Sequence, residues 1–319
     1  MNNIPNISVV MSIYNEPVDW LRASINSILT QTFYDYEFII INDNPRRSVN
    51  EKILNEYKYR DRRIVLILND VNIGLTKSLN KGLSIAKGKY IARMDADDIS
   101  LRRRFQIQYD FMEKNENIGV CGSYVKQIGS NRKKVIKYPL TSHNIKYSLL
   151  YDNQLAHPSV FIRRDIIKKN NIRYNEKYIY AQDYKLWADL YDVCDFSNIP
   201  SILLLYRIRD SQVSHIKKTE QKELSNEIKK ELLFKILKQN KVNIIIANNH
   251  VKQIRYIEKS NIKPVSKAYI YISLYFINKN VPVKYVIYII SKYYKYISYN
   301  AFKYIVTQII QIFKLWFKI

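Results

Sequence analysis

The chain of 319 residues has little cysteine and little glycine. Its two cysteines, Cys121 and Cys194, have no second cysteine at a metal-ligand spacing, so neither a disulfide framework nor a structural zinc site is expected. A reducing compartment such as the cytosol is the simplest environment for such a sequence. The six glycines form neither GxGxxG nor GxxxxGK[ST], so the residues do not support a dinucleotide fingerprint or a P-loop.

Long apolar segments are also missing. The first five residues lack the basic segment and apolar run of a signal peptide, so export is not expected. In the last third, the longest stretches without a charged residue, 268–278 and 304–313, fall short of the roughly 20 apolar residues that cross a bilayer. We therefore expect a cytoplasmic protein without a transmembrane helix.

Acidic residues are too few to balance the basic ones, and the net charge is +24. From residue 216 to the end, 20 Lys and Arg face 5 Asp and Glu, so this third carries +15 of the excess. A set of solvated helices, a surface attracted to anionic lipid and a nucleic-acid surface are the three interpretations. Nucleic acid is not expected as a partner, because the chain has no recognised reader motif.

The first 125 residues alternate between short apolar runs and segments with helical periodicity. Leu21, Ile25, Ile28 and Leu29, for example, repeat at helical spacing. Strands are predicted at 7–13, 37–41, 65–68 and 90–94, and further helices at 49–59 and 75–86, the last closed by Gly88. This alternation predicts parallel crossovers and an open α/β sheet, which binds ligands at the carboxyl ends of its strands.

The pattern from residue 102 to 208 is less regular. It predicts a helix at 105–114, short strands around Val120 and Val160, and a helical stretch at 183–191. No boundary rich in Gly, Pro or Ser separates this part from the first, so both are expected to form one domain. After His215 the chain has no glycine and is rich in Lys, Ile, Tyr and Asn, which predicts amphipathic helices.

Three carboxylates, Asp95, Asp97 and Asp98, directly follow the predicted strand at 90–94. Like charges this close repel one another unless a positive group neutralises them. A divalent cation that also binds phosphate would do so, and one or two of these aspartates could hold it against a pyrophosphate. A solvated acidic turn or a helix N-cap is the alternative.

Polar residues also follow the other predicted strands. Asp43 comes after the strand at 37–41 and suits a hydrogen bond to a nucleobase or ribose, although an ordinary turn aspartate would have the same pattern. Tyr14 and Asn15 end the first strand, close to a helix start whose N–H groups could face a nucleotide. The loop and helix start after the third strand contain Asn72, Gly74, Lys77 and Asn80.

In their order and spacing, these segments resemble the family 2 glycosyltransferases, an inverting family with the GT-A fold. The matching segments are Ser8-Val9-Val10-Met11-Ser12-Ile13-Tyr14-Asn15, Ile40-Ile41-Asn42-Asp43, Asn72-Ile73-Gly74-Leu75, Ala92-Arg93-Met94-Asp95-Ala96-Asp97-Asp98 and Ala181-Gln182-Asp183-Tyr184-Lys185-Leu186-Trp187. Each is weak alone, but together they are highly specific over residues 7–187. Within the family, the chain looks most similar to enzymes that build bacterial surface polysaccharides.

The resemblance implies a Rossmann-like, open mixed α/β sheet flanked by helices, with a C-terminal helical extension. Residues 1–215 would form the GT-A domain, in which 1–110 bind the nucleotide sugar and 111–215 meet the acceptor. Residues 216–319 would form the basic amphipathic helical region.

The resemblance also implies roles for single residues. Asp43 would contact the base or ribose of the donor, and Asp95 its ribose and phosphates. Asp97, with Asp95, would ligate the Mn2+ or Mg2+ that bridges the pyrophosphate. Asp183 would be the general base that takes the proton of the acceptor hydroxyl, although without the family it could be a helix N-cap. The other donor-binding residues would be Tyr14, Asn15, Asn72, Gly74, Lys77 and Ala96.

Four further residues have more than one interpretation. Many relatives have a histidine where this chain has Arg209, which could instead pair with a phosphate. His215 could substitute for that histidine or lie in a solvated loop. His157 lies where such enzymes meet the acceptor, and a structural histidine fits equally well. Trp187 could offer a flat face to a sugar or pack in the core.

The predicted function is therefore an inverting, metal-dependent hexosyl- or N-acetylhexosaminyltransferase. Its donor would be a nucleotide sugar, a UDP-sugar by resemblance, and its acceptor a glycan or lipid-linked glycan in capsule, O-antigen or lipooligosaccharide synthesis. The alternative is a catalytically silent glycan- or lipid-binding scaffold, against which the intact Asp97 and Asp183 argue.

A lipid-linked acceptor favours the membrane interpretation of the basic region. Aromatic and basic residues alternate at its end in a way that is typical of a membrane-interface terminus, namely Phe313, Lys314, Trp316, Phe317 and Lys318. We therefore expect a peripheral location on the inner face of the cell membrane.

Overall fold

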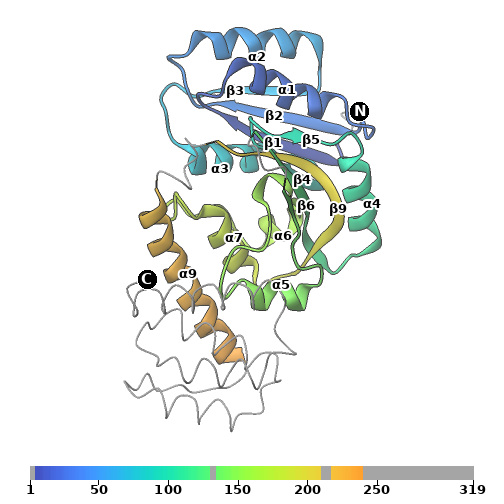
Figure 1. The fold of residues 1–319 in the computed structure, drawn as a ribbon. Coiled ribbons are helices and arrows are strands. Elements are labelled where there is room, and N and C mark those ends of the chain that lie inside the picture. The colour runs from blue at the N-terminus through green and yellow to red at the C-terminus, as the bar shows by residue number, and fades with distance from the viewer. Residues whose placement is uncertain (1–3, 130–133, 210–216, 240–319) are drawn as a thin grey trace. The chain divides into compact units, whose positions relative to one another are not determined.

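The computed structural model describes residues 4–129, 134–209 and 217–239 (Figure 1). The chain divides into two compact units, one of Met1–Ser142 with Leu155–Gln221 and one of His143–Gln154 with Lys222–Ile319. The first unit contains the whole sheet. The second contains a short internal segment as well as the C-terminal part of the chain, and the division into domains at residues 215 and 216 stays a prediction.

The first half of the first unit alternates strands and helices. In chain order they are β1 (Ile7–Ile13), α1 (Val18–Leu29), β2 (Tyr36–Asn42), α2 (Ser48–Arg60), β3 (Ile64–Leu68), α3 (Leu75–Ile85) and β4 (Tyr90–Arg93). Strands β3, β2, β1 and β4 are neighbours in this order and all run parallel. Every residue of β1 and β2 is buried, which explains their uninterrupted apolar character. The elements predicted here are confirmed, with ends that differ by a few residues.

The crossovers place the loops on which the site depends. From β1 the chain moves to β2 and β3 in one direction and then returns to β4 on the other side of β1. Right-handed crossovers therefore put α1 and α2 on one face of the sheet and α3 on the other, as Figure 1 shows. All four parallel strands end at the same edge of the sheet, where ligands bind in open α/β folds.

The second half extends the sheet with strands of mixed direction. Its elements are β5 (Ile99–Ser100), α4 (Arg104–Lys114), β6 (Ile118–Ile128), β7 (Val135–Ile136), η1 (His157–Ser159), β8 (Phe161–Arg163), α6 (Arg164–Lys169), α7 (Gln182–Leu190) and β9 (Asp195–Arg207). After β4 the order continues β8, β6, β9, β5, while β7 pairs with β6. Strand β8 is antiparallel to β4 and β6, whereas β9 is parallel to β6, so the predicted mixed sheet is confirmed.

Strand β9 was not predicted, and it is the longest strand of the described chain. Its end pairs with β5, directly after the acidic segment, with Ile99 opposite Leu205. This pairing brings the residues that follow Leu205 beside the aspartates that precede Ile99.

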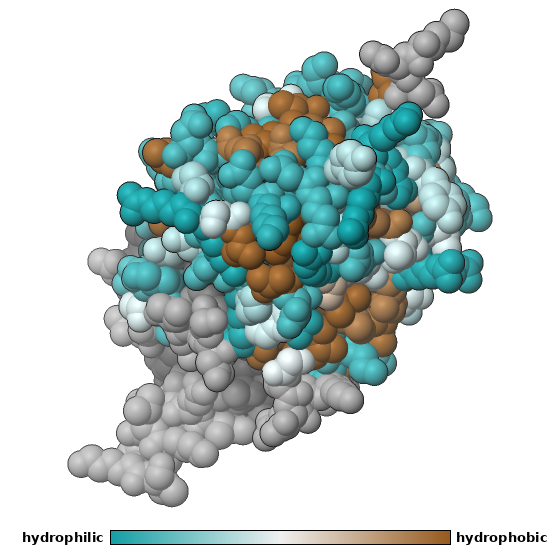
Figure 2. Space-filling model, turned by 90° about the horizontal axis from the view of Figure 1, so that it is seen from above, coloured by the Kyte–Doolittle hydropathy of each residue, from teal (hydrophilic) through white to brown (hydrophobic). Residues whose placement is uncertain are grey.

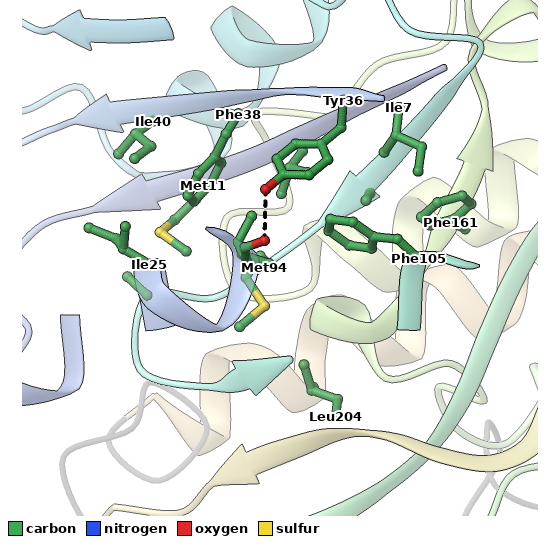
Figure 3. Close-up of a cluster of buried hydrophobic side chains, with 14 of the residues drawn as sticks. Ile7, Met11, Ile25, Tyr36, Phe38, Ile40, Met94, Phe105, Phe161 and Leu204 are labelled. Carbon is green, nitrogen blue, oxygen red and sulfur yellow. Dashed lines mark hydrogen bonds between the residues drawn. The ribbon is translucent and has the colours of Figure 1, made fainter. Parts of the chain in front are cut away.

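An apolar core fixes α1 and α4 against the sheet (Figure 3). Met11 and Phe38 are fully buried, and Phe105 of α4 meets the ring of Tyr36 edge-on at 5.5 Å between centroids. The Tyr36 hydroxyl donates to the carbonyl of Ile28 in α1 at 2.8 Å, the dashed line in Figure 3. Because this core anchors both strands and helices, the loops at the carboxyl edge start from fixed positions.

Gly88 has a different role from the predicted one. Helix α3 ends at Ile85, and a Cβ added to Gly88 would lie 2.5 Å from the backbone nitrogen of Ser8. The Gly88 N–H donates to the Ser8 hydroxyl at 2.8 Å. Glycine is needed because β1 approaches the chain closely, so the prediction that Gly88 caps α3 is wrong.

Two helices reach into the second unit, α5 (Ser142–Ser148) and α9 (Lys218–Gln239). In α9, Ile228, Leu232 and Ile236 are buried at four-residue intervals, which is the pattern of an amphipathic helix. The rest of the predicted basic region, 240–319, lies outside the described residues. Within the described ranges, no helix combines the length and apolarity needed to cross a bilayer. The face drawn in Figure 2 is mainly polar, with apolar side chains in separate patches.

Candidate active site

The three predicted aspartates converge in the loop after β4. One carboxylate oxygen from each of Asp95, Asp97 and Asp98 lies within 4.8 Å of the others. Asp97 is 8% exposed and Asp98 is 1% exposed. Among the described residues, Oδ2 of Asp98 is buried and has no hydrogen-bond partner. Oxygen atoms at this spacing suit a hard divalent cation, so the side chains fit Mg2+ or Mn2+.

Helix α1 and the end of β9 hold this loop in place. The Ser24 hydroxyl of α1 donates to the carbonyl of Asp95 at 2.9 Å. Arg207, the last residue of β9, donates its backbone N–H to Oδ1 of Asp98 at 2.7 Å and its Nε to the carbonyl of Asp97 at 2.8 Å. The loop therefore presents its carboxylates from a braced backbone.

Burial and mutual repulsion both disfavour the ionised form of the carboxylates in this cluster. Burial, and next the charge of Asp95, raise the pKa of Asp97 to about 6, while Arg209 acts to lower it and Glu16 to raise it. Burial also raises the pKa of Asp98 well above its ordinary value, and Asp95 and Asp97 add to this effect. A bound cation would relieve both the repulsion and the cost of burial.

Three arginine side chains place positive charge around the cluster. Arg93 of β4 is 2% exposed and forms an ion pair with Asp95. Arg104 of α4 is fully buried and donates from Nη2 to the carbonyl of Arg93 at 2.9 Å. Nε of Arg209, just beyond β9, lies 3.2 Å from Oδ2 of Asp97. Two of the three carboxylates, those of Asp95 and Asp97, thus have a guanidinium as a direct neighbour.

The predicted base, Asp183, lies in the first turn of α7 and is partly exposed. The N-cap of α7 is Ala181, so the N-cap interpretation of Asp183 is wrong. Oδ1 of Asp183 accepts the backbone N–H of Tyr184 at 2.8 Å, which fixes the carboxylate at the helix start.

Tyr174 is a buried tyrosine whose hydroxyl is influenced by charged groups. Burial raises the pKa of the Tyr174 hydroxyl, and the charges of Asp183 and Asp95 both raise it further, whereas Arg93 lowers it. Asp183 and the acidic cluster both belong to the first unit, and their sharing of one site stays a prediction.

His157 and Trp187 lie beside Tyr174. Nε2 of His157 is 2.8 Å from the Tyr174 hydroxyl. Burial lowers the pKa of His157 well below its ordinary value, with Arg93 adding to the effect, so the ring is neutral at pH 7. Trp187 is fully buried and meets the His157 ring at 6.3 Å between centroids. Core packing is thus its role here, because neither face of Trp187 is open to a sugar.

The predicted donor-binding residues gather at the carboxyl edge. Tyr14 and Asn15 are exposed in the loop after β1, whereas α1 begins only at Val18. Asn72 and Lys77 are exposed around the start of α3, whose N-cap, Gly74, has a φ of +84°. Ala96 is only 3% exposed, and His215 lies outside the described residues.

Asp43 has a role that the sequence did not predict. Its side chain is 2% exposed, and Oδ1 accepts hydrogen bonds from Nδ2 of Asn69 and from the Ile73 N–H, both at 2.9 Å. Oδ2 accepts the Gly74 N–H at 2.9 Å. Asp43 therefore positions the loop between β3 and α3, and its contact with a base or ribose stays a prediction.

Sequence reasoning missed most of the residues that surround the cluster. Arg93 could have been suspected, because an arginine inside an otherwise apolar strand needs a buried partner. Tyr206 had no such signal. Burial raises the pKa of its hydroxyl, and the charges of Asp95, Asp98 and Asp97 add to this.

Known proteins and a family model match large parts of this sequence. Residues 8–170 match the family model described as glycosyl transferase family 2. An uncharacterised glycosyltransferase of Methanocaldococcus jannaschii is 40% identical over 220 residues, which cover 67% of this chain and 75% of that protein. The O-antigen biosynthesis glycosyltransferase WbnJ of Escherichia coli is 34% identical over 212 residues, which cover 64% of this chain and 80% of that protein.

Solved structures show the same fold. S. aureus TarS 1–349 in complex with UDP-GlcNAc has a TM-score of 0.59 at 15% identity, covering 92% of this chain and 82% of that chain. The family model spans half of the chain, and the archaeal relative is similar over two thirds of it. The chain therefore belongs to glycosyl transferase family 2 and is a glycosyltransferase with the GT-A fold.

Proposed function

We propose that the chain is an inverting glycosyltransferase that moves a sugar from a UDP-sugar to a hydroxyl of a glycan or lipid-linked glycan in bacterial surface polysaccharide synthesis. One observation supports the chemistry: carboxylate oxygens of Asp95, Asp97 and Asp98 lie within 4.8 Å of one another in the loop after β4. The named role of WbnJ in O-antigen biosynthesis supports the pathway, and the UDP-GlcNAc bound to TarS supports the donor class.

The donor would bind at the carboxyl edge of β1 to β4. Asp97 and Asp95 would hold Mn2+ or Mg2+ together with the diphosphate. When bound, the metal would neutralise charge on the departing nucleoside diphosphate. Asp43 would keep the β3–α3 loop in a fixed shape, so that the exposed Asn72 and Lys77 can face the nucleotide.

The acceptor would bind between the donor and α7. A sugar hydroxyl is a weak nucleophile at neutral pH, so a carboxylate that takes its proton accelerates attack on the anomeric carbon. Asp183 would be this base. Attack from the side opposite the diphosphate would invert the anomeric centre. His157 and Tyr174, both uncharged at pH 7, would line the acceptor side without competing for the proton.

A donor screen tests this function. The full chain, incubated with Mn2+ or Mg2+ and a panel of UDP-, GDP- and dTDP-sugars, should hydrolyse or transfer one UDP-sugar, as followed by mass spectrometry. Chelation with EDTA should stop the reaction and added metal should restore it. A chain that binds no nucleotide sugar with either metal would contradict the proposal.

For the basic region, 216–319, we propose attraction to an anionic membrane surface beside the glycosyltransferase domain of residues 1–215. Its 20 basic residues against 5 acidic ones, an excess of 15, support this. The full chain should sediment with vesicles of phosphatidylcholine and phosphatidylglycerol but not with phosphatidylcholine alone, and high salt should release it. Equal binding to both vesicles, or to neither, would rule the proposal out.

A further inference from the structure

Asp97, the residue proposed to bind the metal, already forms an ion pair with Arg209. Nε of Arg209 lies 3.2 Å from Oδ2 of Asp97. A metal ion and a guanidinium would therefore use the same carboxylate. The guanidinium of an arginine carries its charge at neutral pH, so Arg209 cannot leave Asp97 by losing that charge. Arg209 can leave Asp97 only if its side chain moves.

The side chain of Arg209 is more exposed than those of the other two arginines of the site. Arg93 is 2% exposed, and Arg104 is fully buried between Gln108, to which its Nε donates at 2.8 Å, and the carbonyl of Arg93. The side chain of Arg209 is 30% exposed. Among the described residues, its Nε makes no hydrogen bond of good geometry, so its contact with Asp97 is an unaligned ion pair.

The other two carboxylates are held by a buried side chain and by a backbone N–H. Asp95 pairs with the buried Arg93, and Oδ1 of Asp98 accepts the backbone N–H of Arg207. Movement of Arg209 alone would open Asp97 while leaving these contacts in place. A diphosphate arriving at the same edge offers the guanidinium oxygen atoms that match its planar donors.

We propose that Arg209 is a displaceable counter-ion of the cluster, which occupies Asp97 in the metal-free protein and moves to the diphosphate when donor and metal bind together. This inference rests on the proposed function. It makes the metal and the nucleotide bind cooperatively, because each helps to remove the guanidinium from Asp97. Such coupling is reciprocal, so UDP should raise the affinity for the metal by the same factor as the metal raises the affinity for UDP.

The test is a Mn2+ titration of the full chain by calorimetry and by electron paramagnetic resonance, with and without UDP. In the unsubstituted protein, UDP should tighten Mn2+ binding about tenfold or more. Arg209→Gln should bind Mn2+ alone about tenfold more tightly, because the competing charge is gone. The same variant should lose most of the coupling and should bind metal-free UDP more weakly.

Arg209→Lys is the matched control, since it keeps the charge and changes only the shape. It should keep the weak binding of Mn2+ alone, which a purely structural role of Arg209 would not predict. Equal or weaker binding of Mn2+ alone by Arg209→Gln would overturn the inference while leaving the proposed function standing. If no protein bound Mn2+ even with UDP, both would fail together.

Discussion

Asp183→Asn is expected to lower sugar transfer by about 10²- to 10⁴-fold, the usual contribution of a positioned general base. The amide keeps the shape of the side chain, and its oxygen can still accept the Tyr184 N–H that Oδ1 of Asp183 accepts at 2.8 Å. The first turn of α7 should therefore stay intact while the proton acceptor is lost. Steady-state transfer rates and a UDP-binding titration separate the two effects.

Donor affinity should change little in this variant, because Asp183 is proposed to act on the acceptor. Asp192→Asn, at an exposed aspartate shortly after the same helix, is the matched control and should keep full turnover. Unchanged turnover in Asp183→Asn would show that another group removes the proton.

Asp97→Asn is expected to have opposite effects on function and on stability. Loss of the proposed metal ligand should reduce metal-dependent transfer by about 10²- to 10³-fold, since a Lewis acid contributes several kcal/mol. The metal-free variant should nevertheless be more stable than the unsubstituted chain at pH 7 to 8. Mn2+ titrations and urea unfolding with EDTA measure the two effects.

The gain in stability follows from the pKa of Asp97, which burial and then Asp95 raise from an ordinary 3.8 to about 6. Below about pH 3 the carboxyl is protonated in both the folded and the unfolded chain, and it costs nothing. As pH rises towards 6, the unfolded chain ionises first, so folding loses free energy and the full cost is present above pH 6. The asparagine variant should therefore gain about 1 to 3 kcal/mol at pH 7 to 8.

The difference between the two proteins should shrink as pH falls and approach zero at about pH 3. Asp110→Asn, an exposed aspartate on α4, should change neither metal binding nor the pH dependence of unfolding. A metal-free Asp97→Asn variant that was less stable at neutral pH would show that the ion pair with Arg209 outweighs the burial of the carboxylate.

The parallel half of the sheet was predictable because its strands are buried on both faces and therefore read as apolar runs. Residues 7–13 matched β1 in full for this reason. The acidic segment could be placed as well, since it follows the apolar run of β4. Strand β9 could not, because its register is set by β6, which lies far away in the sequence, and is interrupted by shifts near Ser123 and Tyr124.

Side-chain roles were harder to predict than positions. The location of Asp43 at the carboxyl edge followed from the strand before it, but its bonds to the N–H groups of Ile73 and Gly74 depend on a loop fold that no local pattern reveals. Trp187 was undecided between a sugar contact and core packing, because both occur on amphipathic helices. Complete burial of its ring required the tertiary packing to be known.

A crystal structure of the full chain with Mg2+ and UDP is the most direct test of the site. The ion should lie about 2.1 Å from an oxygen of Asp97, with diphosphate oxygens completing its shell and the guanidinium of Arg209 turned to the phosphate. The carboxylate of Asp183 should face the side on which the sugar would leave the diphosphate. Nucleotide bound away from the β4 loop, or an ion without Asp95 or Asp97 in its shell, would contradict the proposed chemistry.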